Sequence, residues 1–244
     1  MRIRVINPNT TASMTETAAR AARAVAASGT AIEPMTSKMG PESVEGFYDE
    51  ALAVPGLLAE IASAESDGVD AAIIACFDDT GLDAARSLTA MPVVGLCEAA
   101  VATAAFVAPR FAIVTTLLRS VVPIEGLVAH YGMGGRCRVH AADVPVLALE
   151  DAASGAVGEL RATVAKALED PQVGAIVLGC AGMAELANSL AQAFGVPVID
   201  PVGAAVKQCE ALVGLGLKTA KRGAYAAPLA KRYDGPLAAF APAA

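Results

Sequence analysis

Short runs of β-branched and other apolar residues alternate with longer alanine-rich stretches along almost the whole chain. Apolar runs of about four to eight residues, bounded by Gly, Pro or Asp, are typical of buried strands, and the longer stretches are typical of helices. This alternation predicts an α/β fold with parallel sheets. The expected strands are Arg2–Ile6, Thr30–Pro34, Ala71–Ala75, Pro92–Gly95, Phe111–Thr115, Arg136–His140, Gly174–Gly179 and Pro197–Asp200.

The first predicted helix follows a short loop, Asn7–Thr10. The next residues include Ser13-Met14-Thr15-Glu16, which fits a capping box, a pattern whose first residue caps the helix and whose fourth reaches back to it. We therefore expect a helix that starts just after the loop and has Ser13 as its cap. The loop then lies at the carboxyl end of the first strand.

The second half of the chain repeats features of the first. Ala72–Cys76 is similar to Ile176–Cys180, and each cysteine is followed by a predicted helix and then by a strand opening with Pro-Val, 16 and 17 residues further on. This repeat predicts two similar α/β lobes with the active site in the cleft between them. The first lobe is expected to cover residues 1–97, completed by 206–244, and the second to cover 98–205.

The composition narrows the class of protein. The chain is 55% hydrophobic, 18% charged and only 4% aromatic, so its core must consist of Ala, Val, Leu and Ile. The longest uncharged apolar run, Ala99–Pro109, falls short of the roughly 20 residues that cross a bilayer. A net charge of −7 without a basic cluster argues against binding nucleic acid or an anionic membrane. The start, Met1–Ile6, lacks a secretory signal pattern, which favours a cytoplasmic protein.

The cysteines and histidines limit the available chemistry. Five widely spaced cysteines without a C-x-x-C pair predict neither a disulfide framework nor a zinc site. The two histidines, His130 and His140, do not have the spacing of a metal-ligand pair, so we expect no metal. Three of the cysteines are expected to be packing residues: Cys97, Cys137 and Cys209.

Cys76 and Cys180 are the strongest candidates for a chemical role. Each follows a buried strand and precedes a predicted helix, which is where parallel sheets bind ligands. The backbone N–H groups at a helix start favour an anion, so we expect a thiol pKa lowered toward neutrality. Two thiols on opposite lobes suit inversion of a carbon stereocentre, since one removes a proton and the other delivers one to the opposite face. An adjacent carbonyl that acidifies the carbon makes a cofactor unnecessary.

Four segments carry a resemblance to a known family. They are Asn7-Pro8-Asn9-Thr10-Thr11, Ala75-Cys76-Phe77, Val114-Thr115-Thr116 and Leu178-Gly179-Cys180-Ala181-Gly182-Met183. Together they resemble the hydantoin racemase branch of the aspartate/glutamate racemase superfamily, over nearly the whole chain. The resemblance implies an isomerase with two pseudo-symmetric Rossmann-like lobes, two catalytic thiols and no cofactor, which acts on a small molecule as a homo-oligomer.

The resemblance also implies the residues of the site. By position, Cys76 and Cys180 correspond to the two catalytic thiols. The implied substrate-binding residues are Asn9, Ser43, Val44, Phe77, Thr115, Thr116, Ala181 and Gly182. Asp200, which precedes Pro201, is expected to open a helix and to lie outside the site.

One segment departs from the family pattern. Where hydantoin racemases usually carry Phe-Gly-Asp-Pro-Gly after the first cysteine, this chain has Phe77-Asp78-Asp79-Thr80-Gly81. The carboxylate of Asp78 is expected to raise the pKa of the neighbouring thiol and to repel an anionic substrate, unless it points away to cap a helix.

The residues after the thiols bear on the substrate. Racemases of free aspartate and glutamate typically have Cys-Asn-Thr, in which the Asn and Thr hold the α-carboxylate, and neither cysteine here has that sequel. We therefore expect 5-substituted hydantoins or a related cyclic ureide such as allantoin. The alternatives are an aspartate/glutamate-type racemase, a maleate-type cis-trans isomerase, an arylmalonate-type decarboxylase, which needs one thiol, and a binding protein without catalysis.

Overall fold

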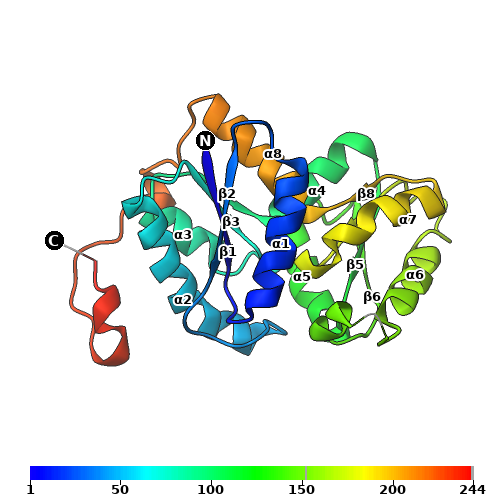
Figure 1. The fold of residues 1–244 in the computed structure, drawn as a ribbon, viewed down its shortest axis with the longest axis horizontal. Helices are drawn as coiled ribbons and strands as arrows, with labels where there is room; N and C mark the ends of the chain where they lie inside the picture. The colour runs from blue at the N-terminus through cyan, green and yellow to red at the C-terminus, as the bar shows by residue number, and fades with distance from the viewer. Residues whose placement is uncertain (152, 243–244) are drawn as a thin grey trace.

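The computed structural model describes residues 1–151 and 153–242, and within them the chain forms two four-stranded parallel sheets (Figure 1). The strand order is β2-β1-β3-β4 in one sheet and β6-β5-β7-β8 in the other, so both sheets have the same topology. The two-lobed α/β prediction is confirmed, and each predicted strand is present with ends shifted by at most two residues. The strands are β1 (Arg2–Asn7), β2 (Ala31–Thr36), β3 (Ala71–Ile74), β4 (Val93–Gly95), β5 (Phe111–Thr115), β6 (Cys137–Ala141), β7 (Ile176–Leu178) and β8 (Val198–Ile199).

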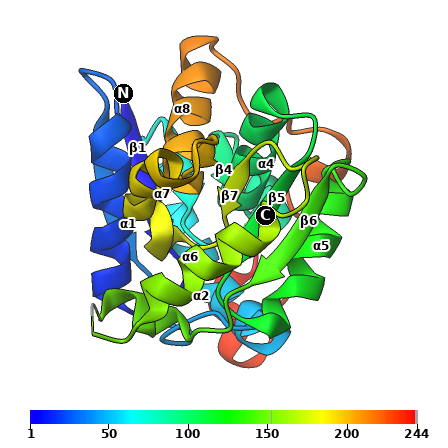
Figure 2. The ribbon, with the colours of Figure 1, turned by 90° about the vertical axis from the view of Figure 1, so that its right-hand side faces the viewer.

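Helices cover the outer faces of both sheets and fill the space between them. The outer helices of the first lobe are α2 (Phe47–Ser66) and α3 (Leu82–Leu88) (Figure 1). Those of the second lobe, which faces the viewer in Figure 2, are α6 (Ala156–Ala167) and α7 (Ala187–Phe194). The helices that contribute to the core between the sheets are α1 (Ala12–Val25), α4 (Leu96–Val107), α5 (Val121–His130) and α8 (Pro201–Gly214). Short 3-10 helices are η1 (Leu118–Ser120), η2 (Val146–Glu150), η3 (Ala181–Leu186), η4 (Gly223–Tyr225) and η5 (Gly235–Phe240).

Alternation along the strands divides the apolar side chains among three cores. In β3, Ala71 and Ile73 face the core that the two sheets share, whereas Ala72 and Ile74 face the outer helices. Successive side chains of a strand point to opposite faces, so a fully apolar strand can serve two cores at once. This explains why the central strands are continuous apolar runs.

The predicted cap of the first helix is wrong by two residues. Helix α1 begins at Ala12 with Thr11 as its N-cap, so Ser13 lies inside the first turn. The Thr11 side chain makes no cap hydrogen bond and donates instead to the backbone oxygen of Glu42, at 2.7 Å. The loop end of the helix is thus tied to the neighbouring loop, and the predicted start just after the first loop is correct.

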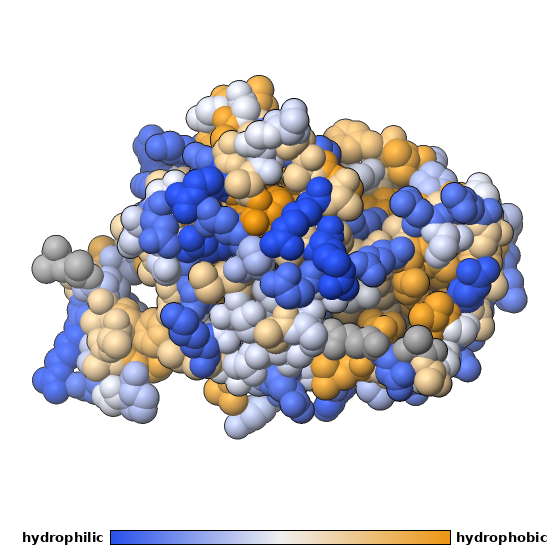
Figure 3. All heavy atoms as spheres, in the orientation of Figure 1, coloured by the Kyte–Doolittle hydropathy of each residue, from blue (hydrophilic) through white to orange (hydrophobic). Residues whose placement is uncertain are grey.

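The segment after α8 runs back along the first lobe. The backbone N–H of Thr219 donates to the oxygen of Ala90 at 3.0 Å, and the ammonium of Lys221 donates to the oxygen of Ser87 at 2.6 Å. The lobe boundaries at residues 97 and 205 stay a prediction. On the face drawn in Figure 3, apolar side chains are interspersed with hydrophilic ones. No helix in the described part of the chain is long and apolar enough to cross a membrane.

Candidate active site

Cys76 and Cys180 line one pocket between the two lobes. They follow β3 and β7, which hold the same place in the order of their sheets, so the repeat brings the two thiols to the same site from opposite lobes. The full lining is Asn9, Met14, Val44, Ala75, Cys76, Phe77, Asp78, Thr115, Thr116, Ser120, Val146, Gly179, Cys180 and Ala181.

The pocket contains all the predicted site residues except Ser43 and Gly182. The hydroxyl of Ser43 donates to the carboxylate of Glu45 at 3.2 Å. Gly182 lies next to the second thiol, since a methyl group on this residue would be 3.8 Å from the Cys180 sulfur. Its backbone N–H lowers the pKa of that thiol, although burial outweighs this effect.

Six lining residues were not predicted as site residues. Two of them, Ala75 and Gly179, directly precede the two thiols in the sequence, and the other four are Met14, Asp78, Ser120 and Val146. Met14 comes from α1, Ser120 from η1 and Val146 from η2, so they reach the pocket only because the two lobes pack together. No local pattern in the sequence marks these three. The fourth is Asp78, which the departure from the family motif had singled out.

Asn9 presents a hydrogen-bond donor to the pocket. Its side chain is buried, with 4% of its surface exposed, and its oxygen accepts from the Asn7 amide at 2.7 Å and from the Thr11 backbone at 2.9 Å. Within the described residues, the amide nitrogen of Asn9 contacts only the sulfur of Met14, at 3.5 Å. Because its oxygen is occupied, Asn9 offers N–H groups to a carbonyl or enolate oxygen.

Thr115 joins the end of β5 to the turn that carries the second thiol. Its hydroxyl donates to the backbone oxygen of Gly179 at 3.2 Å. A methyl group on Gly179 would lie 2.9 Å from the Cβ of Thr115, which is closer than carbon atoms approach. Glycine is therefore required next to Cys180, because β5 and β7 come into contact there.

The prediction of lowered thiol pKa values is wrong. Burial raises the pKa of Cys180 to about 11. Burial also raises the pKa of Cys76 well above its ordinary value, and the Asp78 carboxylate raises it further. The Thr80 hydroxyl favours the thiolate of Cys76, but burial dominates. The helix-start argument fails for Cys76 because α3 begins only at Leu82. The raised pKa values favour the protonated form of both thiols at neutral pH.

Asp78 does not cap a helix. The N-cap of α3 is Gly81, and no side chain caps it. The capping role belongs to the next residue, Asp79, whose carboxylate accepts from the backbone N–H groups of Cys97 and Glu98 at the start of α4, both at 2.9 Å. The expected effect of Asp78 on the neighbouring thiol is confirmed, since its charge raises the pKa of Cys76.

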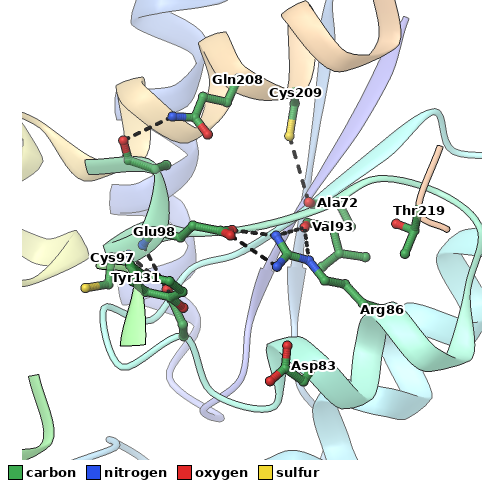
Figure 4. A network of polar contacts seen from close by, with 12 residues as sticks. Ala72, Asp83, Arg86, Val93, Cys97, Glu98, Tyr131, Gln208, Cys209 and Thr219 are labelled. Carbon is green, nitrogen blue, oxygen red and sulfur yellow. Dashed lines mark hydrogen bonds and ion pairs between the residues drawn. The ribbon is translucent and has the colours of Figure 1, made fainter. Parts of the chain in front are cut away.

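Asp79 also links the two lobes. Its carboxylate accepts from the Tyr131 hydroxyl, which follows α5 in the second lobe, at 2.7 Å (Figure 4 shows Tyr131 beside Cys97 and Glu98). Only 5% of Asp79 is exposed. The segment that carries the first thiol is thus fixed by hydrogen bonds to α4 and to the second lobe.

A second polar cluster holds α3 against α4. The guanidinium of Arg86 donates to the carboxylate of Glu98 and, at 3.0 Å, to the backbone oxygen of Val93 (Figure 4). The turn after Cys76 leads into α3, and Asp79 in this turn accepts from the start of α4. By joining the two helices, the ion pair helps to fix the position of the turn.

The remaining candidates lie outside the pocket. Cys97 and Cys209 are buried and Cys137 is half-buried, and none of the three lines the site. Asp200 caps α8 as expected, accepting from the backbone of Val202 and Gly203 at 2.9 Å each. Within the described residues, no group of three or more His, Cys, Asp or Glu side chains could hold a metal ion.

The charge of the pocket is one-sided. Among the residues that the structure describes, Asp78 is the only Asp, Glu, Arg, Lys or His in the lining, and no basic side chain from this part of the chain lines the pocket. The polar groups that remain are hydroxyls, the Asn9 amide and backbone N–H groups. Such a pocket suits a neutral ligand rich in carbonyl oxygens and does not suit a dicarboxylate, which needs charged donors.

Comparisons with known proteins identify the family of the chain. Residues 3–209 match the family described as Asp/Glu/hydantoin racemase. The chain is 49% identical to the hydantoin racemase of Rhizobium meliloti, over 96% of this chain and 98% of that protein. The structure of allantoin racemase from Klebsiella pneumoniae is 48% identical, with a TM-score of 0.96 over 99% of both chains. Allantoin racemase from Pseudomonas fluorescens is 41% identical, with a TM-score of 0.92 over 96% of this chain and 100% of that one.

Proposed function

Because the chain belongs to the Asp/Glu/hydantoin racemase family and is therefore an isomerase of the racemase class, we propose that it inverts the stereocentre of 5-substituted hydantoins or of a related cyclic ureide such as allantoin. The resemblance inferred from the motifs is confirmed by the family match. The observation that carries the proposal is the presence of two thiols, Cys76 and Cys180, in one pocket without a basic side chain. The proposed proton transfer between the thiols and the substrate requires no cofactor.

The proposed reaction is a proton transfer at C5 of the ring. One cysteine, as thiolate, removes the C5 proton, and the electron pair moves onto the adjacent carbonyl oxygen to give an enolate. The other cysteine, as thiol, delivers its proton to the opposite face of C5, so the carbonyl re-forms and the charge passes to the second sulfur. The Asn9 amide supports this step because its nitrogen, which contacts the Met14 sulfur at 3.5 Å, carries N–H groups that suit the enolate oxygen.

The raised thiol pKa values fit this role. A thiolate whose pKa is about 11, as for Cys180, is a stronger base than an ordinary cysteine thiolate, which helps it to remove a proton from carbon. The protonated partner is available at neutral pH because the pKa values of both thiols are raised. The catalytic thiolate is then a minor species, and activity is expected to increase with pH.

The charge of the pocket supports cyclic ureides over the alternatives. Aspartate, glutamate and maleate each carry at least two carboxylates, and the Asp78 carboxylate would repel them. A hydantoin is neutral and presents two ring carbonyls, which match the N–H groups of the pocket. The test incubates the metal-stripped protein with enantiopure hydantoins, allantoin, aspartate and glutamate, and with maleate. Polarimetry measures racemisation of the chiral compounds, and an assay for fumarate measures isomerisation of maleate. A higher kcat/KM for a free amino acid or for maleate contradicts the proposed substrate.

Single substitutions test the two-thiol mechanism. In D₂O, Cys76→Ser is expected to exchange the C5 proton of one enantiomer without inverting it, and Cys180→Ser to exchange the other. Both should lose racemisation by at least about 10²-fold, the typical contribution of an acid–base group. Cys137→Ser is the matched control, because this thiol lies outside the pocket and should not be needed. Racemisation near the wild-type rate in either active-site variant contradicts the mechanism.

A further inference from the structure

A second pocket adjoins the thiol pocket, and Asp78 lies in the wall of both. The second pocket opens between α2 of the first lobe and α5 of the second. Its lining is Phe47, Glu50, Asp78, Pro123, Gly126, Leu127 and His130. Because Asp78 lines both pockets, the space nearest to a ring in the thiol pocket on the Asp78 side is lined mainly by apolar residues and by a second carboxylate, that of Glu50.

The two carboxylates at this junction have no partner. Within the described residues, neither Asp78 nor Glu50 accepts a hydrogen bond or forms an ion pair through its side chain. Burial and the charge of Glu50 raise the pKa of Asp78 to about 6, and burial raises the pKa of Glu50. Both residues are half-buried. A carboxylate that loses part of its hydration without a counter-charge is destabilised, because that loss goes uncompensated.

We propose that Asp78, together with Glu50, selects cyclic ureides whose 5-substituent ends in a cationic, hydrogen-bond-donating group such as an ammonium. The methylene stem of this substituent packs against Phe47, Pro123 and Leu127, and its charged end lies between the two carboxylates. The inference rests on the proposed racemase function and adds the class of side chain. It also gives a role to the residue that replaces the usual glycine of the family motif.

The charged groups around Asp78 come from several elements. Glu50 lies on α2 and His130 at the end of α5, and both line the second pocket. Glu45 and Asp78 both act on the Cys180 thiol and raise its pKa. One cation is also near, since a methyl group on Gly46 would be 3.7 Å from the Nε atom of Arg119. The carboxylates of Asp78, Glu50 and Glu45 outnumber this guanidinium, which favours a cation at the junction and disfavours an anionic substituent.

The test compares two substrates that differ only in charge. For the purified full chain, kcat/KM is measured for enantiopure 5-(4-aminobutyl)hydantoin and for 5-butylhydantoin, which lacks the ammonium. The wild type should prefer the amino compound, and Asp78→Asn should reduce the ratio of the two constants at least tenfold. Glu50→Gln should reduce it as well. Asp83→Asn, an isosteric change at the carboxylate that bonds the Tyr225 hydroxyl outside both pockets, is the control and should leave the ratio unchanged.

The pH dependence gives a second readout. The ammonium stays protonated between pH 5 and pH 8, whereas Asp78 gains its charge as the pH increases through about 6. The wild-type ratio should therefore increase over this range, and the increase should be lost in Asp78→Asn. If the wild type racemises neither of these two hydantoins nor allantoin, the proposed function is overturned. Racemisation of both with a ratio that Asp78→Asn does not change overturns this inference and leaves the racemase function standing.

Discussion

Replacement of Tyr131 by phenylalanine removes one hydroxyl and leaves the aromatic ring in place. That hydroxyl donates to the buried carboxylate of Asp79 at 2.7 Å and connects the second lobe to the segment after Cys76. A hydrogen bond to a charged group contributes about 1.5–3 kcal/mol to stability. The free energy of unfolding should decrease by that amount, because Asp79 keeps its two backbone donors and loses only the third.

The loss should depend on pH. Burial raises the pKa of Asp79 to about 7, and the Tyr131 hydrogen bond opposes this shift. Between the unfolded pKa of about 3.9 and the folded value, the folded state binds more protons, so the contribution of Asp79 to stability decreases as pH rises. The variant removes an interaction with the charged form. The difference between wild type and Tyr131→Phe should therefore widen as the pH increases through 7.

Thermal unfolding followed by far-ultraviolet circular dichroism measures the effect. The chain has no tryptophan and four tyrosines, one of which is changed, so fluorescence is a poor probe. For a protein of this size, about 1.5–3 kcal/mol corresponds to a decrease in Tm of about 3–12 °C.

Tyr225→Phe is the matched control. Its hydroxyl also donates to a carboxylate at 2.7 Å, that of Asp83, but this hydrogen bond is exposed. Exposed interactions of this kind contribute little, so the control should change stability by no more than about 0.5 kcal/mol. Equal losses in the two variants would refute the reasoning that burial sets the strength of the Tyr131 hydrogen bond.

Three further outcomes are expected. The rate of Cys180 alkylation by iodoacetamide, followed by mass spectrometry, should increase tenfold per pH unit up to about pH 11, and a plateau near pH 7 contradicts the raised pKa. Gly179→Ala should destabilise the protein by about 1–3 kcal/mol in urea unfolding, since the new methyl group meets Thr115. The control Gly158→Ala has open space around the new methyl group in α6 and should stabilise the protein by about 0.5–1 kcal/mol. Racemisation should survive treatment with a chelator, because no group of metal ligands occurs within the described residues; restoration by a divalent metal after such treatment contradicts this.

Much of the fold follows from the apolar pattern because each central strand serves two cores and is apolar on both faces. Phe111 and Ile113 of β5 face the shared core, and Ala112 and Val114 face the outer helices, which gives the continuous run that predicts a buried parallel strand. The repeat around the two cysteines predicted that both thiols lie at one site, because β3 and β7 hold the same place in their sheets. Two sheets of one topology place equivalent positions at equivalent edges.

Two kinds of feature were not revealed by the sequence. One depends on which of two neighbouring residues takes a given position, and the other depends on how deeply the whole fold buries a group. Thr11 rather than Ser13, and Asp79 rather than Asp78, occupy the cap positions, because neighbouring residues of similar chemistry compete for one place. The thiol pKa values depend on how many atoms surround each sulfur, which no local motif encodes. Most of the residues that line the pocket were predicted through the resemblance, and residues such as Val146 were missed because their position depends on how the lobes pack.

The shared core has a consequence for synthesis on the ribosome. Helix α8, close to the end of the chain, packs on α1 and α4 and contacts β3 and β4 of the first lobe (Figure 1). The nascent first lobe consequently keeps part of its inner apolar face uncovered until residues 201–214 have left the exit tunnel. The chain therefore cannot complete one lobe before it starts the next, and the whole polypeptide is the unit that folds.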